Sequence, residues 1–308
     1  MAISTLQRLG NTLSLGQNHK QVASFTIEHG VIKLLVCRGL QVLDYRVLLA
    51  NPRFFREGQV GQVARTAALI ANVLPGMAGT FQRVVGAVPG FQNSLRLLEL
   101  PRAGGLNPNV VVPQEASRAM HVSLETYHLS WYRRPDRLDR TRWLVLAANR
   151  RSITSLVDTA RMAGMGVTTL ELRPFALARA INQPDAVIAW VAPDGCDVVI
   201  VKESVPVEHQ SLFWGAELVE DAVLVDRLTE IVGRTIAAYD TTSPEGPLPE
   251  EAPLYVCGSP IGRTPDIARQ VAANLQRPAE ELVPPLECPA DFPVQDLIVN
   301  IGLTLREA

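Results

Sequence analysis

The sequence of 308 residues is long enough for two domains of ordinary size. Hydrophobic residues make up 47% of it and charged residues 19%, a balance that excludes a disordered or low-complexity chain. The 29 basic and 31 acidic residues give a net charge of −2, so no overall basic field attracts nucleic acid or anionic lipid. The apolar runs are far shorter than the roughly 20 residues that cross a bilayer, which predicts a soluble globular protein without direct membrane insertion.

The four cysteines are isolated in the sequence and form no C-x-x-C pair. We therefore predict a reduced cytoplasmic protein with neither a disulfide framework nor a zinc site. Residues 1–23 contain no continuous apolar stretch of the kind found in a secretory signal. Within this N-terminal segment we expect a short amphipathic helix over 3–15 that docks on the body of the protein or on a partner.

Alternating apolar residues open the folded part of the chain. The runs 24–37 and 41–50, with Gly39 between them, predict an antiparallel hairpin. Residues 59–73 have the spacing of an amphipathic helix. The other elements predicted in this half are extended stretches within 81–100, a short helix over 114–120 and a strand over 121–132.

A strand–helix–strand–helix succession then occupies 143–181, with helices over 151–163 and 174–181. This order predicts a parallel pair of strands, ending near 148 and 172, covered by a helix, and hence an α/β sheet. The elements predicted beyond it are a hairpin over 185–206, a helix over 216–239, a mobile acidic and proline-rich loop over 241–253, a strand over 254–258, a helix over 265–275 and a final apolar segment. The hairpins over 24–50 and 185–206 occupy corresponding positions in the two halves of the chain. We therefore predict a duplicated domain around a cleft.

Several stretches together resemble the type IV pilus assembly protein PilM family. That family is also called competence protein A-like, and it has the actin-like ATPase fold and is related to FtsA. The most specific stretches are LELRPFALARAI, with the AGM that precedes it, and the ending IGLTLR. The resemblance runs from about Ser24 to Arg306, and the other stretches that carry it are SFTIEHGVIKLLVC, VPGFQNSLRLLELP, MHVSLETYHLSWY and LYVCGSPIG.

This resemblance implies an actin-like two-lobe fold, in which two ribonuclease-H-like domains bind nucleotide between them. The first lobe would span 24–184, with a small inserted subdomain at about 78–130. The second would span 185–308, with a reduced outer subdomain at about 215–250. The resemblance also implies a partner, PilN, whose cytoplasmic N-terminal tail docks on PilM and so places it at the inner face of the cytoplasmic membrane.

The first phosphate-binding hairpin of the family is degenerate in this chain. An actin-like ATPase needs glycines where phosphates approach backbone N–H groups, and an aspartate in each phosphate hairpin to organise Mg²⁺. Aligned on Lys33, this chain has Thr26 at the aspartate position and Glu28 at the glycine position. The hydroxyl positions hold His29 and Gly30. A carboxylate about 4 Å from a phosphate costs roughly 4 kcal/mol at an effective dielectric constant near 20, so Glu28 opposes phosphate binding.

The other nucleotide motifs are altered as well. The second hairpin has Trp190 and Ala192 in place of aspartate and glycine, which removes the second Mg²⁺ ligand and adds an indole. The paired glycines before the second-lobe helix are reduced to Gly215. The glycines of the adenosine motif are reduced to Gly258, followed by Ser259. The reduced outer subdomain would also lack part of the wall around adenine.

These changes predict a pseudo-ATPase with no catalytic residue, no metal site and no cofactor. The alternative is a functional ATPase of the same machinery that binds ATP with Mg²⁺ through a rebuilt site, using Glu28 or Asp194 as a metal ligand. Lys33 is open to two interpretations, a phosphate contact or a solvent-facing lysine on an alternating strand. The arginine cluster within 133–142 is interleaved with aspartates, which favours a solvated loop or an acidic protein partner over nucleic acid.

The function expected from the resemblance is a cytoplasmic adaptor or scaffold of a type IV pilus or competence-pilus machine. It would hold the tail of a PilN-like membrane protein as an extended segment, near the junction of the first lobe and its inserted subdomain. Self-association and contact with the pilus motor are further possible interactions. The residues predicted to line the partner groove are Arg96, Leu98, Pro101, His121, Leu124, Phe175 and Arg179.

Overall fold

The structure is a computed structural model that describes residues 20–28, 30–56, 59–101, 107–137, 139–215, 220–243 and 245–306. The helix predicted over 3–15 lies outside these residues. So do His29 and the side chain of Glu28, two of the residues assigned to the first phosphate hairpin.

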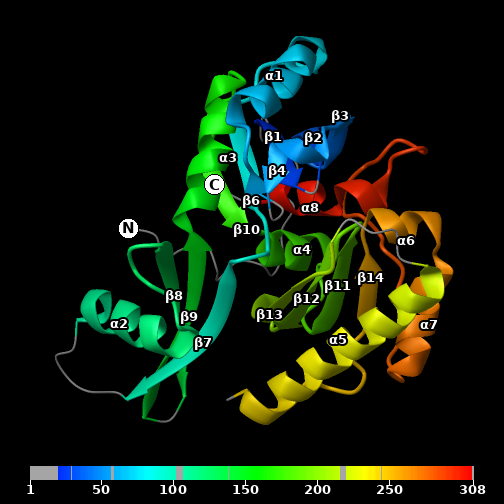
Figure 1. Ribbon diagram of the computed structural model, residues 1–308. Helices are drawn as coiled ribbons and strands as arrows, with labels where there is room; N and C mark the ends of the chain where they lie inside the picture. The colour runs from blue at the N-terminus through cyan, green and yellow to red at the C-terminus, as the bar shows by residue number, and fades with distance from the viewer. Residues whose placement is uncertain are drawn as a thin grey trace.

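The first lobe is built on five strands: β1 (Gln21–Glu28), β2 (Val31–Arg38), β3 (Gln41–Leu49), β6 (Arg83–Val88) and β10 (Thr169–Leu172). Their order is β10-β6-β1-β2-β3, in which the first three strands form an antiparallel meander and β6 and β10 extend it in parallel (Figure 1). The run 24–37, predicted as one strand, is therefore two strands that turn at Gly30, whose φ is 75°. Both strands consist almost entirely of buried residues, and only the three residues Glu28-His29-Gly30 separate the two apolar stretches in the sequence.

The second lobe repeats this arrangement with β11 (Ala186–Ala192), β12 (Gly195–Lys202), β13 (Val205–Phe213) and β14 (Leu254–Cys257). The order is β13-β12-β11-β14, again an antiparallel meander with a parallel strand beside its first member. Where the first lobe has β10, the second has only an isolated parallel bridge between Leu254 and Ala279. The pairing confirms the predicted duplication.

Four helices complete the first lobe and the region between the lobes. α1 (Val63–Val73) and α3 (Arg150–Met162) pack on one face of the first-lobe sheet. α4 (Arg173–Ile181) and α8 (Val294–Thr304) lie between the two sheets, in an apolar core to which both lobes contribute (Figure 1). The two helices approach so closely that a Cβ at Gly302 would lie 1.8 Å from the carbonyl oxygen of Ala176.

The second-lobe sheet is covered on its other face by α5 (Asp221–Thr242) and α7 (Asp266–Asn274). None of the helices in the described part of the chain has the length and apolarity that spanning a bilayer requires. The remaining short elements are α6 (Ser259–Arg263), the 3₁₀ turns Pro52–Phe54 and Leu74–Gly76, and the two-residue strands β4 (Phe55–Arg56) and β5 (Gln59–Val60). The helix predicted over 59–73 begins only at Val63, because 59–60 pair with β4.

A small third sheet is inserted in the first lobe. It consists of β7 (Ser94–Pro101), β8 (Tyr127–Arg137) and β9 (Arg140–Asn149), antiparallel in the order β7-β9-β8, with α2 (Pro108–Met120) packed on one face. Strand pairing thus places the insertion at 94–149, whereas the sequence suggested about 78–130. The strand predicted to end near 148 is β9, and it does not pair with β10; the parallel partner of β10 is β6.

The structure differs from two local predictions, the start of α2 and the mobility of the loop 241–253. α2 begins before 114, because the side chain of Asn107 caps it by accepting a hydrogen bond from the N–H of Asn109. The loop 241–253, expected to be mobile, is packed in its described part: Leu248 and Ala252 are buried. Arg277 holds the loop by donating to the carbonyl oxygens of Pro249 and Ala252, at 2.9 and 3.2 Å.

Candidate functional site

Lys33 and Ser259, assigned to opposite sides of the cleft, are in direct contact. Lys33 Nζ donates a hydrogen bond to Ser259 Oγ at 3.3 Å, and the lysine is only 5% exposed. Burial lowers the pKa of Lys33 from 10.5 to about 8, an effect that Asp296 partly opposes. The solvent-facing interpretation of Lys33 is therefore wrong, and its ammonium group joins β2 to the start of α6 across the lobes.

The polar groups of the first hairpin are satisfied by α8. The buried side chain of Asn300 accepts from Thr26 Oγ1 at 3.4 Å and donates to the carbonyl oxygen of Lys33 at 3.2 Å. Ser24 Oγ donates to the backbone carbonyl of the same asparagine at 3.1 Å. Thr26 therefore faces the protein interior. Gly30 forms the turn, and its carbonyl oxygen accepts from the N–H of Ala50 at 2.8 Å.

In the second hairpin, Trp190 is covered by a guanidinium group. Arg173 Cζ lies 3.9 Å from the centre of the indole ring, and both side chains are almost completely buried. The position assigned to the Mg²⁺-organising aspartate thus holds an aromatic ring stacked against a cation. Ala192, at the glycine position, is part of the apolar core between the lobes.

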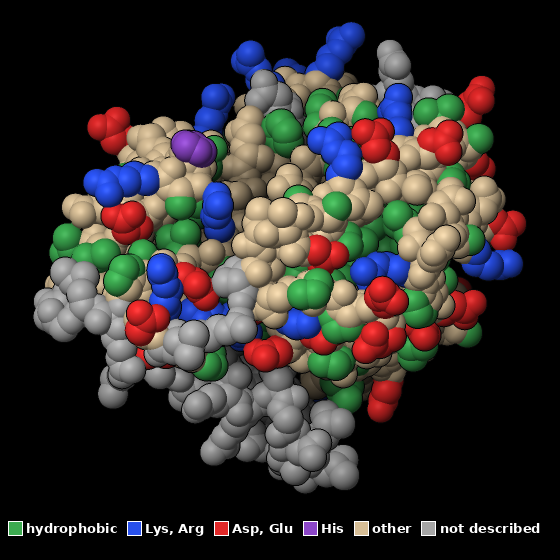
Figure 2. Space-filling model, turned by 90° about the horizontal axis from the view of Figure 1, so that it is seen from below, with side chains coloured by type: hydrophobic (Ala, Val, Ile, Leu, Met, Phe, Trp, Pro, Cys, Tyr) green, Lys and Arg blue, Asp and Glu red, His purple; other side chains and the backbone are tan. Residues whose placement is uncertain are grey.

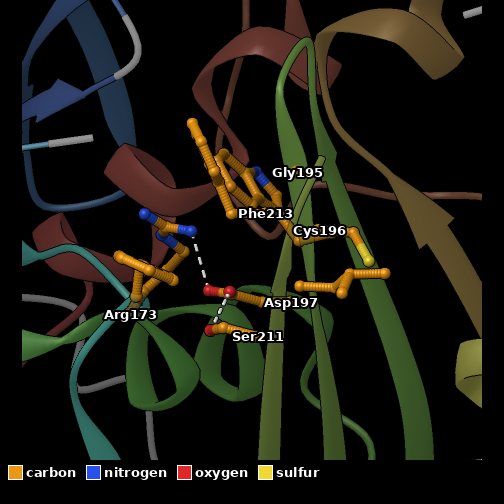
Figure 3. A pocket seen from close by; sticks show the side chains of 9 residues that line it. Arg173, Gly195, Cys196, Asp197, Ser211 and Phe213 are labelled. Carbon is orange, nitrogen blue, oxygen red and sulfur yellow. Dashed lines mark hydrogen bonds and ion pairs between the residues drawn. The ribbon is translucent and has the colours of Figure 1, made fainter. Parts of the chain in front are cut away.

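Arg173 also forms a buried ion pair with Asp197 of β12 (Figure 3). Arg173 Nη1 donates to Asp197 Oδ2 at 2.7 Å, and Ser211 Oγ donates to Asp197 Oδ1 at 2.5 Å. Burial by itself would raise the pKa of Asp197, but Arg173 and then His209 outweigh it and hold that pKa well below its ordinary value. The carboxylate is therefore ionised and links α4 of the first lobe to the second-lobe sheet.

The space beside this ion pair is very small. A cavity of about 10 Å³ is bounded by the ion pair, Trp190, Phe91 and Phe213, and it offers no more room than one water molecule needs. Phe91 and Phe213 come from opposite lobes, with ring centres 5.7 Å apart. The side chains of Arg173, Trp190, Phe91 and Phe213 thus fill the space beside the second hairpin, and the two positions assigned to Mg²⁺-organising aspartates hold Thr26 and Trp190.

The neighbouring Ser211, His209 and Asp197 do not form a hydrolytic triad. A triad needs one ring nitrogen of the histidine on the serine and the other on the aspartate. Here the same atom, His209 Nε2, lies 3.1 Å from Ser211 Oγ and 3.5 Å from Asp197 Oδ2. His209 Nδ1 has no hydrogen-bond partner among the residues that the structure describes.

The glycines that remain of these motifs, Gly258 and Gly215, both lie in the second lobe. Gly258 has φ of 116°, and a Cβ there would lie 2.0 Å from the carbonyl oxygen of Val191. Gly215 also has positive φ, at 86°. It follows Trp214, whose backbone N–H donates to the carbonyl oxygen of Asp194 at 2.8 Å. The structure thus places Gly258 against the hairpin that carries Trp190, and the residue before Gly215 is hydrogen-bonded to the same hairpin.

Arg173 and Asp197 are the site residues that the sequence analysis missed. Asp197 interrupts an otherwise apolar run, Cys196–Val201, and a charge inside such a run needs a buried partner. Arg173 lies inside the LELRPFALARAI block, which served only to indicate the family. The position of Asp197 in an apolar run therefore indicated a buried ion pair, but nothing in the sequence indicated that Arg173 is its partner.

The residues predicted to form one partner groove lie on different surfaces. Leu98 is buried beneath α2, whereas Phe175 packs with Leu95 on the opposite face of the small sheet. Arg179 forms a double hydrogen bond with the carboxylate of Glu171, at 2.8 and 3.1 Å, far along α4. These three side chains therefore do not share a groove.

The other four remain at the surface. Arg96 donates to the carbonyl oxygen of Ala119 at 2.5 Å, which places it at the C-terminal end of α2. His121 and Leu124 follow that helix end and are exposed. Pro101 is exposed at the end of β7. The structure thus places Arg96 beside the helix end that His121 follows, and Leu124 comes three residues later in the chain.

The arginine cluster contacts acidic residues of the same chain. Arg142 forms an ion pair with Glu245, and Arg134 forms one with Glu203 at 2.9 Å. Both carboxylates belong to the second lobe, so these ion pairs fasten the inserted sheet to it. Figure 2 shows basic and acidic side chains interspersed over the face seen from below.

The chain is similar in structure to a chain of the PilM–PilN type IV pilus biogenesis complex. The TM-score is 0.75 at 17% identity, covering 92% of this chain and 97% of that one. It is also similar to the cytoplasmic domain of EpsL, an inner membrane component of the type II secretion system of Vibrio cholerae, with a TM-score of 0.53 and 14% identity over 93% and 96% of the two chains.

A third similar structure is MreB 5 of Spiroplasma citri bound to AMPPNP, with a TM-score of 0.52 and 11% identity over 92% and 94% of the two chains. No protein-family model and no curated protein matches the sequence. The likenesses confirm the predicted fold: the chain has the actin-like two-lobe architecture, and that architecture is shared with PilM.

Proposed function

We propose that the chain is a PilM-like adaptor of a type IV pilus, competence-pilus or related secretion machine, and that it has lost nucleotide binding. The observation that carries the second part is the Arg173–Trp190–Asp197 cluster, which fills the second phosphate hairpin with the protein's own side chains. The Lys33–Ser259 contact closes the other side of the cleft in the same way. A nucleotide would have to displace both before it could bind.

In this proposal the two lobes need no nucleotide to hold them together. The apolar core around α4 and α8 and the buried Arg173–Asp197 pair already join them. The protein would act as a preformed platform at the inner face of the cytoplasmic membrane, held there by the cytoplasmic tail of a PilN-like membrane protein. The fold shared with a chain of the PilM–PilN complex supports this partner.

The surface that best fits an extended tail surrounds the C-terminal end of α2. Arg96, His121 and Leu124 lie there, and Leu124 is 42% exposed, which is high for a leucine. Arg150 Nη2 donates to the carbonyl oxygen of Leu124 at 3.4 Å and adds a second basic group. A tail with an apolar anchor and acidic residues matches this combination.

A synthetic peptide of the partner's tail is expected to bind the full-length chain with Kd in the range of about 10 μM, or roughly −7 kcal/mol. Leu124→Glu should weaken binding at least about tenfold, because it removes the apolar contact for the anchor of the tail and repels the acidic residues of the peptide. Fluorescence anisotropy of the labelled peptide measures both values. Met162→Glu is the matched control, since Met162 is 56% exposed on α3 and lies outside this surface.

A tail that does not bind the unchanged chain would refute the proposed partner. If the Leu124 and Met162 variants bind the peptide equally well, the proposed partner is retained, but the surface at the end of α2 is excluded as its binding site.

A further inference from the structure

The strap, residues 279–287, joins the two lobes between α7 and α8 (Figure 1). At one end Ala279 forms a parallel bridge with Leu254 of the second-lobe sheet, and at the other Glu287 forms one with Gln41 of the first-lobe sheet. Between these attachment points, residues 281–286 form no backbone-to-backbone hydrogen bond with any described residue. The middle of the strap therefore offers main-chain donors and acceptors that the rest of the described chain does not use.

A cavity of about 350 Å³ lies between the strap, the C-terminal end of α4 and Tyr255 of β14. Its volume is within the range of roughly 300–1,000 Å³ that is typical of ligand sites, whereas the cavity beside Arg173 has room for one water molecule. Ile181 of α4 and Pro284 of the strap contribute apolar walls. The cavity thus has room for a side chain with an apolar stem.

The charged residues that line this cavity are both acidic. Glu280 and Glu281 belong to the strap and are exposed. The pKa of the Tyr255 phenol is raised first by burial and then by the negative charge of Glu280, whose carboxylate is close to it. α4 ends at Asn182, which also lines the cavity, so the negative end of the helix dipole borders it. A cation is therefore favoured in this cavity and an anion is repelled.

We propose that the strap is a docking site for an extended, basic segment of a partner protein, and that one arginine side chain of that segment enters the cavity. The apolar walls contact the stem of the arginine, and Glu280 and Glu281 accept hydrogen bonds from its guanidinium group. The main chain of the segment pairs with the unused N–H and C=O groups of residues 281–286, as an added strand does. Val283, which is 82% exposed, contacts a neighbouring apolar side chain of the segment.

The main chain of the strap is the reason to assign this site to a protein. A small organic cation would fill the cavity but would leave the N–H and C=O groups of residues 281–286 unpaired. The inference rests on the strap and its cavity and does not depend on the nucleotide cleft or on the surface at the end of α2.

The probe for this site is a capped peptide with arginine at its centre and a valine and a threonine on each side. Isothermal titration calorimetry with the full-length chain should give a Kd below about 1 mM. Replacing the arginine of the peptide by citrulline, which has a similar shape and no charge, should raise the Kd at least about tenfold. This comparison uses the unchanged protein, so it does not depend on how a variant folds.

Changing the two carboxylates tests the charge of the cavity from the side of the protein. Glu280→Gln combined with Glu281→Gln should raise the Kd of the arginine peptide at least about tenfold, because both negative charges are removed. Glu251→Gln is the matched control, since Glu251 is exposed and is not among the residues that line the cavity, and it should leave the Kd within about twofold. Thermal melting checks that each variant is folded.

Absence of binding, or equal binding of the arginine and citrulline peptides, would overturn the proposal. A Kd that the changes at Glu280 and Glu281 leave unaltered would overturn it as well. Arginine amide alone should bind at least about tenfold more weakly than the peptide, because it cannot pair with the strap, and equal affinity would indicate a site for a small molecule instead. Binding that appears only after residues 1–19 are removed would show that the chain's own N-terminal segment covers the strap, which would also exclude the partner.

Discussion

Replacing Arg173 with methionine should lower the free energy of unfolding by about 3–5 kcal/mol, the cost of breaking a buried ion pair from one side. Asp197 would keep its negative charge in the interior with Ser211 and His209 as its remaining contacts. In a chain of this size the loss corresponds to a fall in Tm of about 5–8 °C. Differential scanning calorimetry at pH 7 measures it directly.

Two further variants separate the ion pair from general effects of losing an arginine. Arg234 is 77% exposed and pairs with Glu230 on the surface of α5, so Arg234→Met should change the stability by less than about 0.5 kcal/mol. Replacing both Arg173 by Met and Asp197 by Leu should recover most of the loss, because no unpaired charge remains. An Arg173 variant as stable as the Arg234 variant would contradict the role given to this pair.

Replacing Lys33 with methionine should have the opposite effect and stabilise the protein at neutral pH. The folded-state pKa of Lys33, about 8, lies below the ordinary value of 10.5 because the charged form is desolvated. At about 1.4 kcal/mol per pKa unit, the charged lysine costs on the order of 3 kcal/mol below pH 8. Methionine fills a similar volume without that cost.

The stabilisation by Lys33→Met should depend on pH in a definite direction, which can be measured. Between about pH 8 and 10.5 the unfolded chain binds more protons at Lys33 than the folded one, so this residue makes stability rise with pH over that interval. The advantage of the Lys33→Met variant should be largest at pH 7 and should shrink toward pH 10.5. Urea unfolding of both proteins across this interval measures the difference. If the two proteins differ in unfolding free energy by the same amount at every pH, or if the variant is less stable at pH 7, then burial of the charged Lys33 side chain does not destabilise the folded protein.

The sequence predicted the fold well where one physical signal dominates. The amphipathic helix at 150–162 was predictable because Asn149 caps it and Gly164, with φ of 87°, follows its end. The hairpin of β11 and β12 was predictable from the turn at Asp194-Gly195. Strand pairing was not predictable, because β9 and β10 both border α3 but belong to different sheets.

The candidate site was predicted only in part. The motif positions assigned Lys33 and Ser259 to one cleft, and the structure has the two side chains in contact, with Gly258 against the hairpin that carries Trp190. The stacking of Arg173 on Trp190 and its pairing with Asp197 depend on how α4 meets the second lobe, which no local pattern encodes. The partner residues were grouped by nearness in sequence, although alternate residues of a strand such as β7 point to opposite faces.

The central claim, that the cleft no longer accepts a nucleotide, is tested most directly by melting the protein with and without Mg-ATP. A nucleotide present at about 100 times its Kd would stabilise the folded state by about 2.7 kcal/mol. We predict no change in Tm at millimolar Mg-ATP, because the side chains of Arg173, Trp190 and Lys33 occupy the site. A rise of several degrees that saturates with nucleotide concentration would contradict the account and favour a functional ATPase.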